Sequence, residues 1–184
     1  MKKVFLFGVV AVLFGAAASC SHNNDNVVAG VDPSAEAPAI ESFIAANGLD
    51  YLTQDTAAGA AGLMSYVFDA GNLNRKYADS IPVVYFEISG NLLNGQNFYS
   101  SIGTSVRYNF SQTATDNTDV ENVLMTFVVA HYLQVLGEGG SVTFVTPSAY
   151  SYSYLSLAFL NGVTVPPNSP LYYDFLKIDS IRKN

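Results

Sequence analysis

Residues 80–99 read SIPVVYFEISGNLLNGQNFY, and this stretch decides the fold. Residues 80–89 are rich in β-branched and aromatic side chains, and residues 91–99 resume the pattern around a turn at Asn94-Gly95. An Asn-Gly pair between two such runs is typical of a tight hairpin, because both residues tolerate a positive φ. The stretch therefore predicts two antiparallel strands.

Further strands are expected on both sides of this hairpin. Residues 62–68 and 105–111 alternate apolar with polar side chains, which is the pattern of a half-buried strand. Residues 141–146 and 171–181 are also predicted to be strands. No internal repeat is visible. Several strands with one long helix favour an α+β fold, in which an antiparallel sheet wraps around the helix.

Two helices are predicted. Residues 119–136 form the longer one, with Asp119 as a possible N-cap and glycines after its last turn. Its apolar face would consist of Leu124, Phe127, Val128, His131, Tyr132 and Val135. Residues 39–47 predict a short amphipathic helix, which Gly48 would end.

The composition excludes several classes of function. The chain has 184 residues, with 8 Lys and Arg against 15 Asp and Glu, so its net charge is −7. Such an acidic chain is a poor partner for nucleic acid, whose phosphates require Lys and Arg. One Cys and two His exclude a disulfide framework and a Cys- or His-rich metal centre. We therefore expect no metal site and no cofactor.

The N-terminus predicts export and a lipid anchor. Two lysines precede an apolar run over residues 4–18, and small residues lead from this run to Cys20. The arrangement resembles a bacterial lipoprotein signal, in which the Cys becomes the lipidated first residue, although Ala17 stands where Leu is usual. The alternative is an ordinary cleaved signal with a chance Cys. We expect a lipid-anchored protein of the bacterial cell envelope, facing the periplasm.

Four later segments resemble one family when they are taken in order. They are SGNLLNGQNFYSS at 89–101, LGEGGSVTFVTP at 136–147, PSAYSY at 147–152 and VPPNSPLYYDF at 165–175. These segments are similar to motifs of the FKBP-type peptidyl-prolyl isomerases, and the likeness spans about residues 62–181. The predicted divisions are then 1–19 (signal sequence), 20–38 (lipidated Cys and flexible tether), 39–61 (N-terminal helix and linker) and 62–184 (FKBP-like domain).

The resemblance implies a curled antiparallel sheet around a central helix, and cis–trans isomerisation of X-Pro bonds in exported polypeptides. Rotation about such a bond faces a barrier of about 18–20 kcal/mol. No nucleophile, metal or cofactor is needed to lower it. A dry aromatic pocket holds the proline ring and favours the twisted amide, which is less polar than the planar one.

The resemblance also assigns residues to the pocket. Phe98 corresponds to the family's pocket ring, Tyr152 to the hydroxyl that donates to a substrate carbonyl, and Tyr173 to a ring of the wall. The other substrate-binding positions would be Tyr99, Val106 or Tyr108, Met125, Thr126 and Val129. Each of the three rings has an alternative role as a plain core residue. The same alignment starts the long helix near Phe127 rather than at Asp119, and both starts remain open.

Three departures from the family pattern lie in this pocket. Tyr99 replaces an Asp, Ile88 replaces a Tyr, and Val129 replaces the Trp of the pocket floor. Two hydrogen-bonding groups are thereby lost, which favours peptide binding over turnover. The alternatives are therefore a catalytically weak peptide-binding or chaperone lipoprotein, and a lipoprotein of mainly structural role. An apolar insertion at 153–164 is expected either to cap the pocket or to bind client polypeptides.

Overall fold

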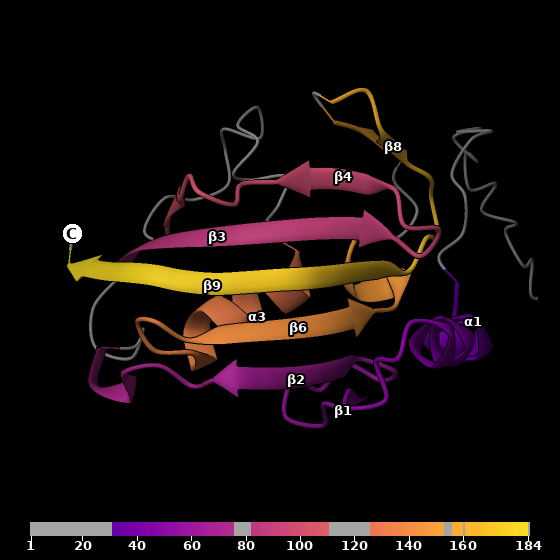
Figure 1. Ribbon diagram of the computed structural model, residues 1–184, viewed down its shortest axis with the longest axis horizontal. Coiled ribbons are helices and arrows are strands. Elements are labelled where there is room, and N and C mark those ends of the chain that lie inside the picture. The colour runs from indigo at the N-terminus through magenta and orange to yellow at the C-terminus, as the bar shows by residue number, and fades with distance from the viewer. Residues whose placement is uncertain (1–30, 76–81, 111–125, 153–155, 160, 184) are drawn as a thin grey trace, which may run out of the picture.

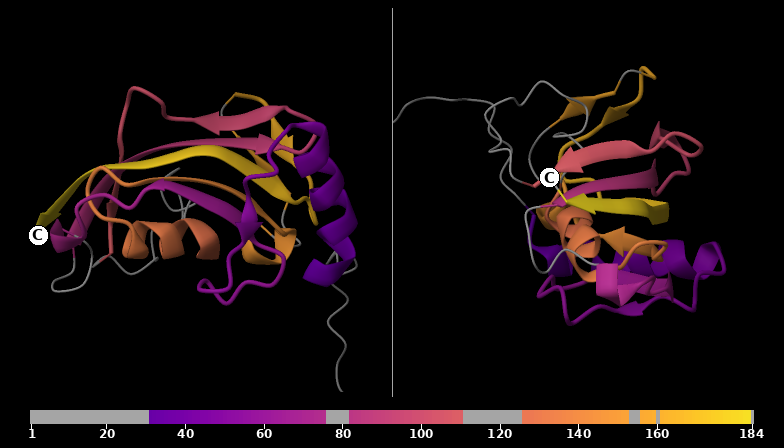
Figure 2. Two further views of the ribbon diagram at one scale, coloured as in Figure 1. Left: turned by 60° about the horizontal axis from the view of Figure 1, so that its bottom comes forward. Right: turned by 90° about the vertical axis from the view of Figure 1, so that its left-hand side faces the viewer.

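The computed structural model describes residues 31–75, 82–110, 126–152, 156–159 and 161–183. An antiparallel sheet of seven strands curls over one face of a single helix, α3 (Phe127–Val135), as Figures 1 and 2 show. The strand order is β1-β2-β6-β9-β3-β4, with β5 paired to β3. The predicted α+β class, with an antiparallel sheet wrapped around a helix, is confirmed.

Five strands of this sheet lie between α1 and α3 in the sequence, and two follow α3. Their bounds are β1 (Thr53–Gln54), β2 (Met64–Asp69), β3 (Pro82–Leu92), β4 (Asn97–Ser100), β5 (Val106–Asn109), β6 (Ser141–Thr146) and β9 (Leu171–Lys183). Two short 3₁₀ turns, η1 (Leu73–Arg75) and η3 (Ser148–Tyr150), lie between them. A separate two-stranded hairpin, β7 (Leu157–Ala158) and β8 (Thr164–Val165), comes from the predicted insertion.

The hairpin predicted at Asn94-Gly95 is confirmed as β3 and β4. Gly95 has φ +85° and donates its N–H to the carbonyl of Leu92 at 2.9 Å. A left-handed backbone favours glycine at this position, because a side chain there would strain the turn. On its other side β3 pairs with β9 along its whole length, which joins the hairpin to the rest of the sheet.

The central helix begins at Phe127, as the family resemblance implied, and not at Asp119. Thr126 is its N-cap, and the Thr126 hydroxyl accepts the N–H of Val129 at 3.4 Å. Residues 119–125 lie outside the described part of the chain. The predicted apolar face is also wrong in part, because Phe127 and Val135 are exposed. The face that meets the sheet consists of Val128, Val129, Tyr132 and Leu133.

The N-terminal helix is longer than predicted. α1 spans Pro33–Ala46, so residues 33–38, which were assigned to the tether, are helical. Asp32 caps the helix by accepting the N–H of Ser34 at 2.9 Å, and Pro33 occupies the first turn, where a missing N–H costs nothing. Pro38 lies inside the helix and obscured this start in the sequence.

Two cores hold these layers together. The main core fills the space between α3 and the inner face of the sheet. A second core forms where α1 packs on the outer face, with Ile40, Ile44, Leu49, Leu52 and Val145 as its buried members. Among the described residues no helix is both long and apolar enough to span a bilayer. The described residues also contain no group of three acidic, His or Cys side chains placed to hold a metal ion.

Candidate functional site

The three rings assigned to the pocket lie together, although they come from distant parts of the chain. Phe98 is on β4, Tyr152 follows η3, and Tyr173 is on β9. The centroid of the Phe98 ring lies 6.3 Å from that of Tyr152 and 5.9 Å from that of Tyr173, both edge to face. Such geometry is favourable between aromatic rings. We call Phe98, Tyr152, Tyr173 and their neighbour Phe159 the ring cluster.

A glycine on the adjacent strand makes room for Phe98. A Cβ added to Gly90 would lie 2.4 Å from Cζ of Phe98, closer than two carbon atoms can approach. β3 therefore passes directly beneath the ring, and Phe98 has no exposed surface. Gly90, the first glycine of the SGNLLNG segment, is thus required by the position of the Phe98 ring, in addition to any role that it has in the hairpin.

Helix α3 and β6 form the rest of the wall. Val129, which replaces the Trp of the family pattern, is fully buried on α3. On the other side, Phe144 of β6 stacks on Tyr173 with centroids 4.6 Å apart and planes at 23°. Ile88 is fully buried on β3, and its N–H donates to the hydroxyl of Ser101 at 3.0 Å. The three substitutions expected from the sequence therefore leave a site rich in aromatic and aliphatic side chains.

Within the described part of the chain, three hydroxyl groups in this site are buried and have no hydrogen-bond partner. They belong to Ser151, Tyr152 and Tyr173. An unpaired buried hydroxyl costs about 1–3 kcal/mol, so the arrangement is unfavourable unless another molecule supplies the missing partners. The site therefore offers unused donors inside an apolar surround, which is what a peptide carbonyl requires.

Burial keeps both tyrosines protonated. Desolvation raises the pKa of Tyr152 well above its ordinary value of 10.0, and Tyr173 adds to that rise. Desolvation likewise raises the pKa of Tyr173 to about 12. The hydroxyls of Tyr152, Ser151 and Thr126 lie near enough to oppose the rise at Tyr173, yet none of them completes a hydrogen bond to it. Both tyrosines are therefore hydrogen-bond donors at neutral pH.

The insertion places one further ring over the cluster. Phe159, between β7 and β8, is only 9% exposed. Its centroid lies 4.9 Å from that of Phe98 and 6.0 Å from that of Tyr152. The Phe159 N–H donates to the carbonyl of Val163 at 2.8 Å, and the Asn161 amide donates to the carbonyl of Asn97 on β4 at 3.2 Å. The insertion is thus fastened to the strand that carries Phe98.

The remaining predicted site residues have different positions. Tyr99 is half-buried and its ring lies 6.3 Å from that of Phe159, beside the cluster. Thr126 is buried at the start of α3. Val106 and Tyr108 lie on β5, opposite Phe86 and Val84 of β3, and both pack against the main core. Met125 and the predicted lipidation site Cys20 lie outside the described residues.

The sequence placed Phe159 in an insertion that would either cap the pocket or bind clients, but it did not single out this side chain as a member of the site. The only available signal was the apolar character of the insertion, which does not say which side chain turns inward. The same is true of Ser151, whose unpaired hydroxyl emerges only when the fold brings η3 beside β9.

Comparison with solved structures identifies the fold. No family model and no curated protein matches the chain. A structure of the three FKBP domains of wheat FKBP73 superposes with a TM-score of 0.50 at 20% identity, over 72% of this chain and 49% of that one. A peptidyl-prolyl cis–trans isomerase from Pseudomonas syringae pv. tomato gives 0.50 at 16% identity, over 85% of this chain and 100% of the other.

A third structure, FkpA from Escherichia coli, gives a TM-score of 0.48 at 18% identity over 82% of this chain. This chain spans 64% of FkpA and about half of FKBP73. The fold is that of the FKBP-type peptidyl-prolyl isomerases, which confirms the resemblance at the level of the fold.

Proposed function

We propose that this chain, which has the FKBP-type fold, is a peptidyl-prolyl cis–trans isomerase that acts on X-Pro bonds of exported proteins. The observation that carries the proposal is the convergence of Phe98, Tyr152 and Tyr173 beside buried hydroxyls that lack partners. Aromatic walls fit a pyrrolidine ring, and free donors fit the carbonyl that precedes it. Fold alone does not determine activity, so the proposed activity rests on the residues of this site.

In this mechanism each residue has a simple physical task. Phe98 and Tyr173 contact the proline ring and keep water away from the amide. The Tyr152 hydroxyl donates to a substrate carbonyl and holds the peptide while the X-Pro bond rotates. Because the twisted amide is less polar than the planar one, the dry surround stabilises it relative to water and lowers the barrier of about 18–20 kcal/mol. No bond to the substrate is made or broken.

Substrate entry requires Phe159 to move. In the structure the Phe159 ring rests against Phe98, at the place where a proline ring would have to make contact. We therefore propose that the proline of a substrate displaces Phe159 and takes over its contact with Phe98.

A second candidate function is peptide binding with little turnover. The observations that favour it are the ring of Phe159 on Phe98 and the small Val129 in place of a larger ring. A pocket that must first expel its own side chain, and that has lost part of its floor, would still recognise proline segments. Such a protein would act as a chaperone or assembly factor for exported polypeptides.

The cellular setting is also a proposal. The lysines, apolar run and Cys20 support export and a lipid anchor in the bacterial cell envelope, with the domain facing the periplasm. Several acyl chains on one Cys would hold the protein stably, since each buried CH₂ contributes about 0.8 kcal/mol.

Exchange spectroscopy on a short X-Pro peptide distinguishes the two functions. We expect the protein without residues 1–19 to accelerate cis–trans exchange over buffer. Tyr152→Phe should reduce kcat/KM about fivefold, the loss expected for one neutral hydrogen bond of about 1 kcal/mol. Tyr85→Phe on β3, away from the cluster, is the matched control. Peptide binding with exchange no faster than in buffer would establish the second function, and absence of both would exclude this site.

A further inference from the structure

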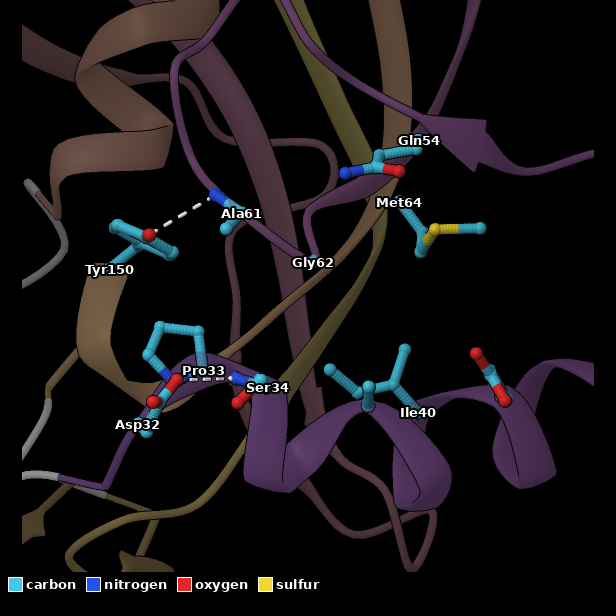
Figure 3. Close-up of a pocket in the computed structure, with 11 residues that line it drawn as sticks. Asp32, Pro33, Ser34, Ile40, Gln54, Ala61, Gly62, Met64 and Tyr150 are labelled. Carbon is cyan, nitrogen blue, oxygen red and sulfur yellow. Dashed lines mark hydrogen bonds between the residues drawn. The ribbon is translucent and has the colours of Figure 1, made fainter.

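A recess lies between α1 and the segment that leads into β2 (Figure 3). We call it the α1 recess, and its volume is about 520 Å³. Pro33, Ala37 and Ile40 of α1 form one wall, and Gly62 and Met64 form the other. This volume and the apolar lining are typical of sites that bind a ligand. No member of the ring cluster lines it.

The charged side chains that line the α1 recess are both carboxylates, which attract cations. Asp32 is the N-cap of α1, where Figure 3 labels it, and Glu41 lies about two turns further along the same helix. Asp32 accepts the backbone N–H of Ser34 at 2.9 Å, which stabilises its ionised form. The Tyr150 hydroxyl accepts the N–H of Ala61 at 3.1 Å and closes one side. The lining contains no Lys, Arg or His to neutralise the two carboxylates.

The surrounding segment has the same charge. Residues 31–74 contain six Asp and Glu and no Lys, Arg or His. One of the six, Glu36, is buried and accepts the N–H of Ser148 at 2.7 Å, so it takes no part in the surface. The field over α1 and β2 is therefore uniformly negative, and it favours a cationic partner over an anionic one.

An exposed row of aromatic rings continues from the recess along β2. Met64, which lines the recess, is followed on the same face by Tyr66 and Phe68, which are 44% and 59% exposed. Their ring centroids lie 5.0 Å apart, and Tyr51 packs against both at 5.4 and 5.9 Å. Three exposed rings that contact one another form a patch, which marks an interaction surface more often than isolated apolar residues do.

Among the described residues, no strand pairs with the outer edge of β2 beside this patch. β1 pairs only with Met64 and Ser65, so no described strand covers the outer edge of β2 from Tyr66 onward. An open edge offers backbone donors and acceptors to an extended chain. A compact small molecule would fill the recess but would use neither the row of rings nor the strand edge. The combination fits a polypeptide.

We propose that the α1 recess and the Tyr51–Tyr66–Phe68 patch together bind one extended polypeptide segment in which apolar residues alternate with Lys or Arg. One apolar side chain enters the recess over Ile40 and Met64, and neighbouring cations approach Asp32 and Glu41. Further apolar side chains contact the rings of Tyr66 and Phe68. This surface is separate from the ring cluster, and it requires no proline in the ligand.

The test is fluorescence anisotropy with the full chain in detergent and a labelled, proline-free peptide of alternating Leu and Lys. A peptide of about ten residues extends about 33 Å when its chain is fully extended. A peptide of alternating Leu and Glu is the control for charge. We expect the Leu/Lys peptide to bind and the Leu/Glu peptide to bind at least tenfold more weakly.

Two pairs of matched variants locate the binding. Ala37→Leu fills the recess and should weaken binding of the Leu/Lys peptide about tenfold, whereas Ala39→Leu, on the exposed side of the same helix, should not. Glu41→Gln should weaken binding about threefold and reduce its dependence on salt, whereas Glu87→Gln on β3 should not. The Gln variants keep the fold intact even if Ala37→Leu disturbs α1.

The proposal is overturned if the Leu/Lys peptide fails to bind, if both peptides bind equally, or if each variant behaves like its control. Since the peptide lacks proline, an absence of isomerase activity has no bearing on this result. The failure of either proposal is thus recognised separately.

Discussion

Replacement of Phe159 by Ala tests whether this ring occupies the place of the substrate. Phe159 makes ring contacts with Phe98, Tyr152 and Tyr99 at centroid distances of 4.9, 6.0 and 6.3 Å. Each such contact contributes about 0.5–1.5 kcal/mol, so expelling the ring costs about 3 kcal/mol before any new contacts that it makes outside. If these new contacts restore about a third of that, the substrate bears a net penalty of about 2 kcal/mol.

Removing this penalty should raise kcat/KM, or peptide affinity if turnover is absent, by about 30-fold, because 1.36 kcal/mol corresponds to a factor of ten. Phe159→Leu, which leaves a smaller side chain against Phe98, should give an intermediate gain in kcat/KM or peptide affinity. The assays are cis–trans exchange and binding of the same X-Pro peptide, each at saturating and subsaturating concentrations.

The stability of the variant is the control. Phe159 is nearly buried, so Phe159→Ala should lower the free energy of unfolding by about 3 kcal/mol while leaving one cooperative transition. A variant that melts cooperatively but binds the peptide more weakly than the wild type would refute the reasoning. Phe159 would then be part of the binding wall, and the insertion would be a contact for the substrate.

Three further predictions concern the scaffold of the site. Tyr132→Phe should lower the free energy of unfolding by about 1.5–3 kcal/mol in a urea titration, because it removes a 2.8 Å hydrogen bond to the carboxylate of Asp55. The wild type should lose stability as the pH falls through and below 3.8, the ordinary pKa of Asp55, and Asp55→Asn should flatten this dependence. Gly90→Ala should cost about 1–3 kcal/mol and shift the NMR signals of Phe98, since the new Cβ overlaps its ring, whereas Gly90→Ala with an unchanged melt and spectrum would contradict the packing.

The sign of the pH effect follows from the contacts of Asp55. Burial alone would raise the pKa of this carboxyl, but hydrogen bonds from Tyr132, Ala58, Ala57 and Ser65 together lower it below its ordinary value. The folded state therefore favours the ionised form. The resulting stabilisation is present in full above the unfolded pKa and is lost as the pH falls through the folded one.

Several strands were predictable from local features. The turn at Gly95 and the run of residues 141–146 were read correctly, since turn chemistry and a preference for β-branched and aromatic side chains act over a few residues. The helix starts were less predictable. Asp119 and Thr126 are both acceptable N-caps, and the choice of Phe127 as the first helical residue depends on which side chains meet the sheet.

The members of the ring cluster are far apart in the sequence. Phe98, Tyr152 and Tyr173 were assigned to one pocket only through resemblance to a family. Nothing local to Phe98 says that Tyr152 and Tyr173 lie beside it, since the contact requires β4, η3 and β9 to be assembled. The local sequence pattern also does not show that the Phe98 side chain is fully buried. Because Phe98 is fully buried, Phe98→Ala would open a cavity in the core and cost about 3–5 kcal/mol, so the smaller change Tyr152→Phe tests the site better.

The most direct measurement of the central claim is a set of intermolecular nuclear Overhauser contacts between a bound X-Pro peptide and the aromatic protons of the protein. We predict contacts from the proline ring to Phe98 and Tyr173, with the signals of Phe159 shifted as its ring leaves the cluster. Proline contacts that fall only on other surfaces, with the ring cluster unperturbed at saturating peptide, would contradict the account.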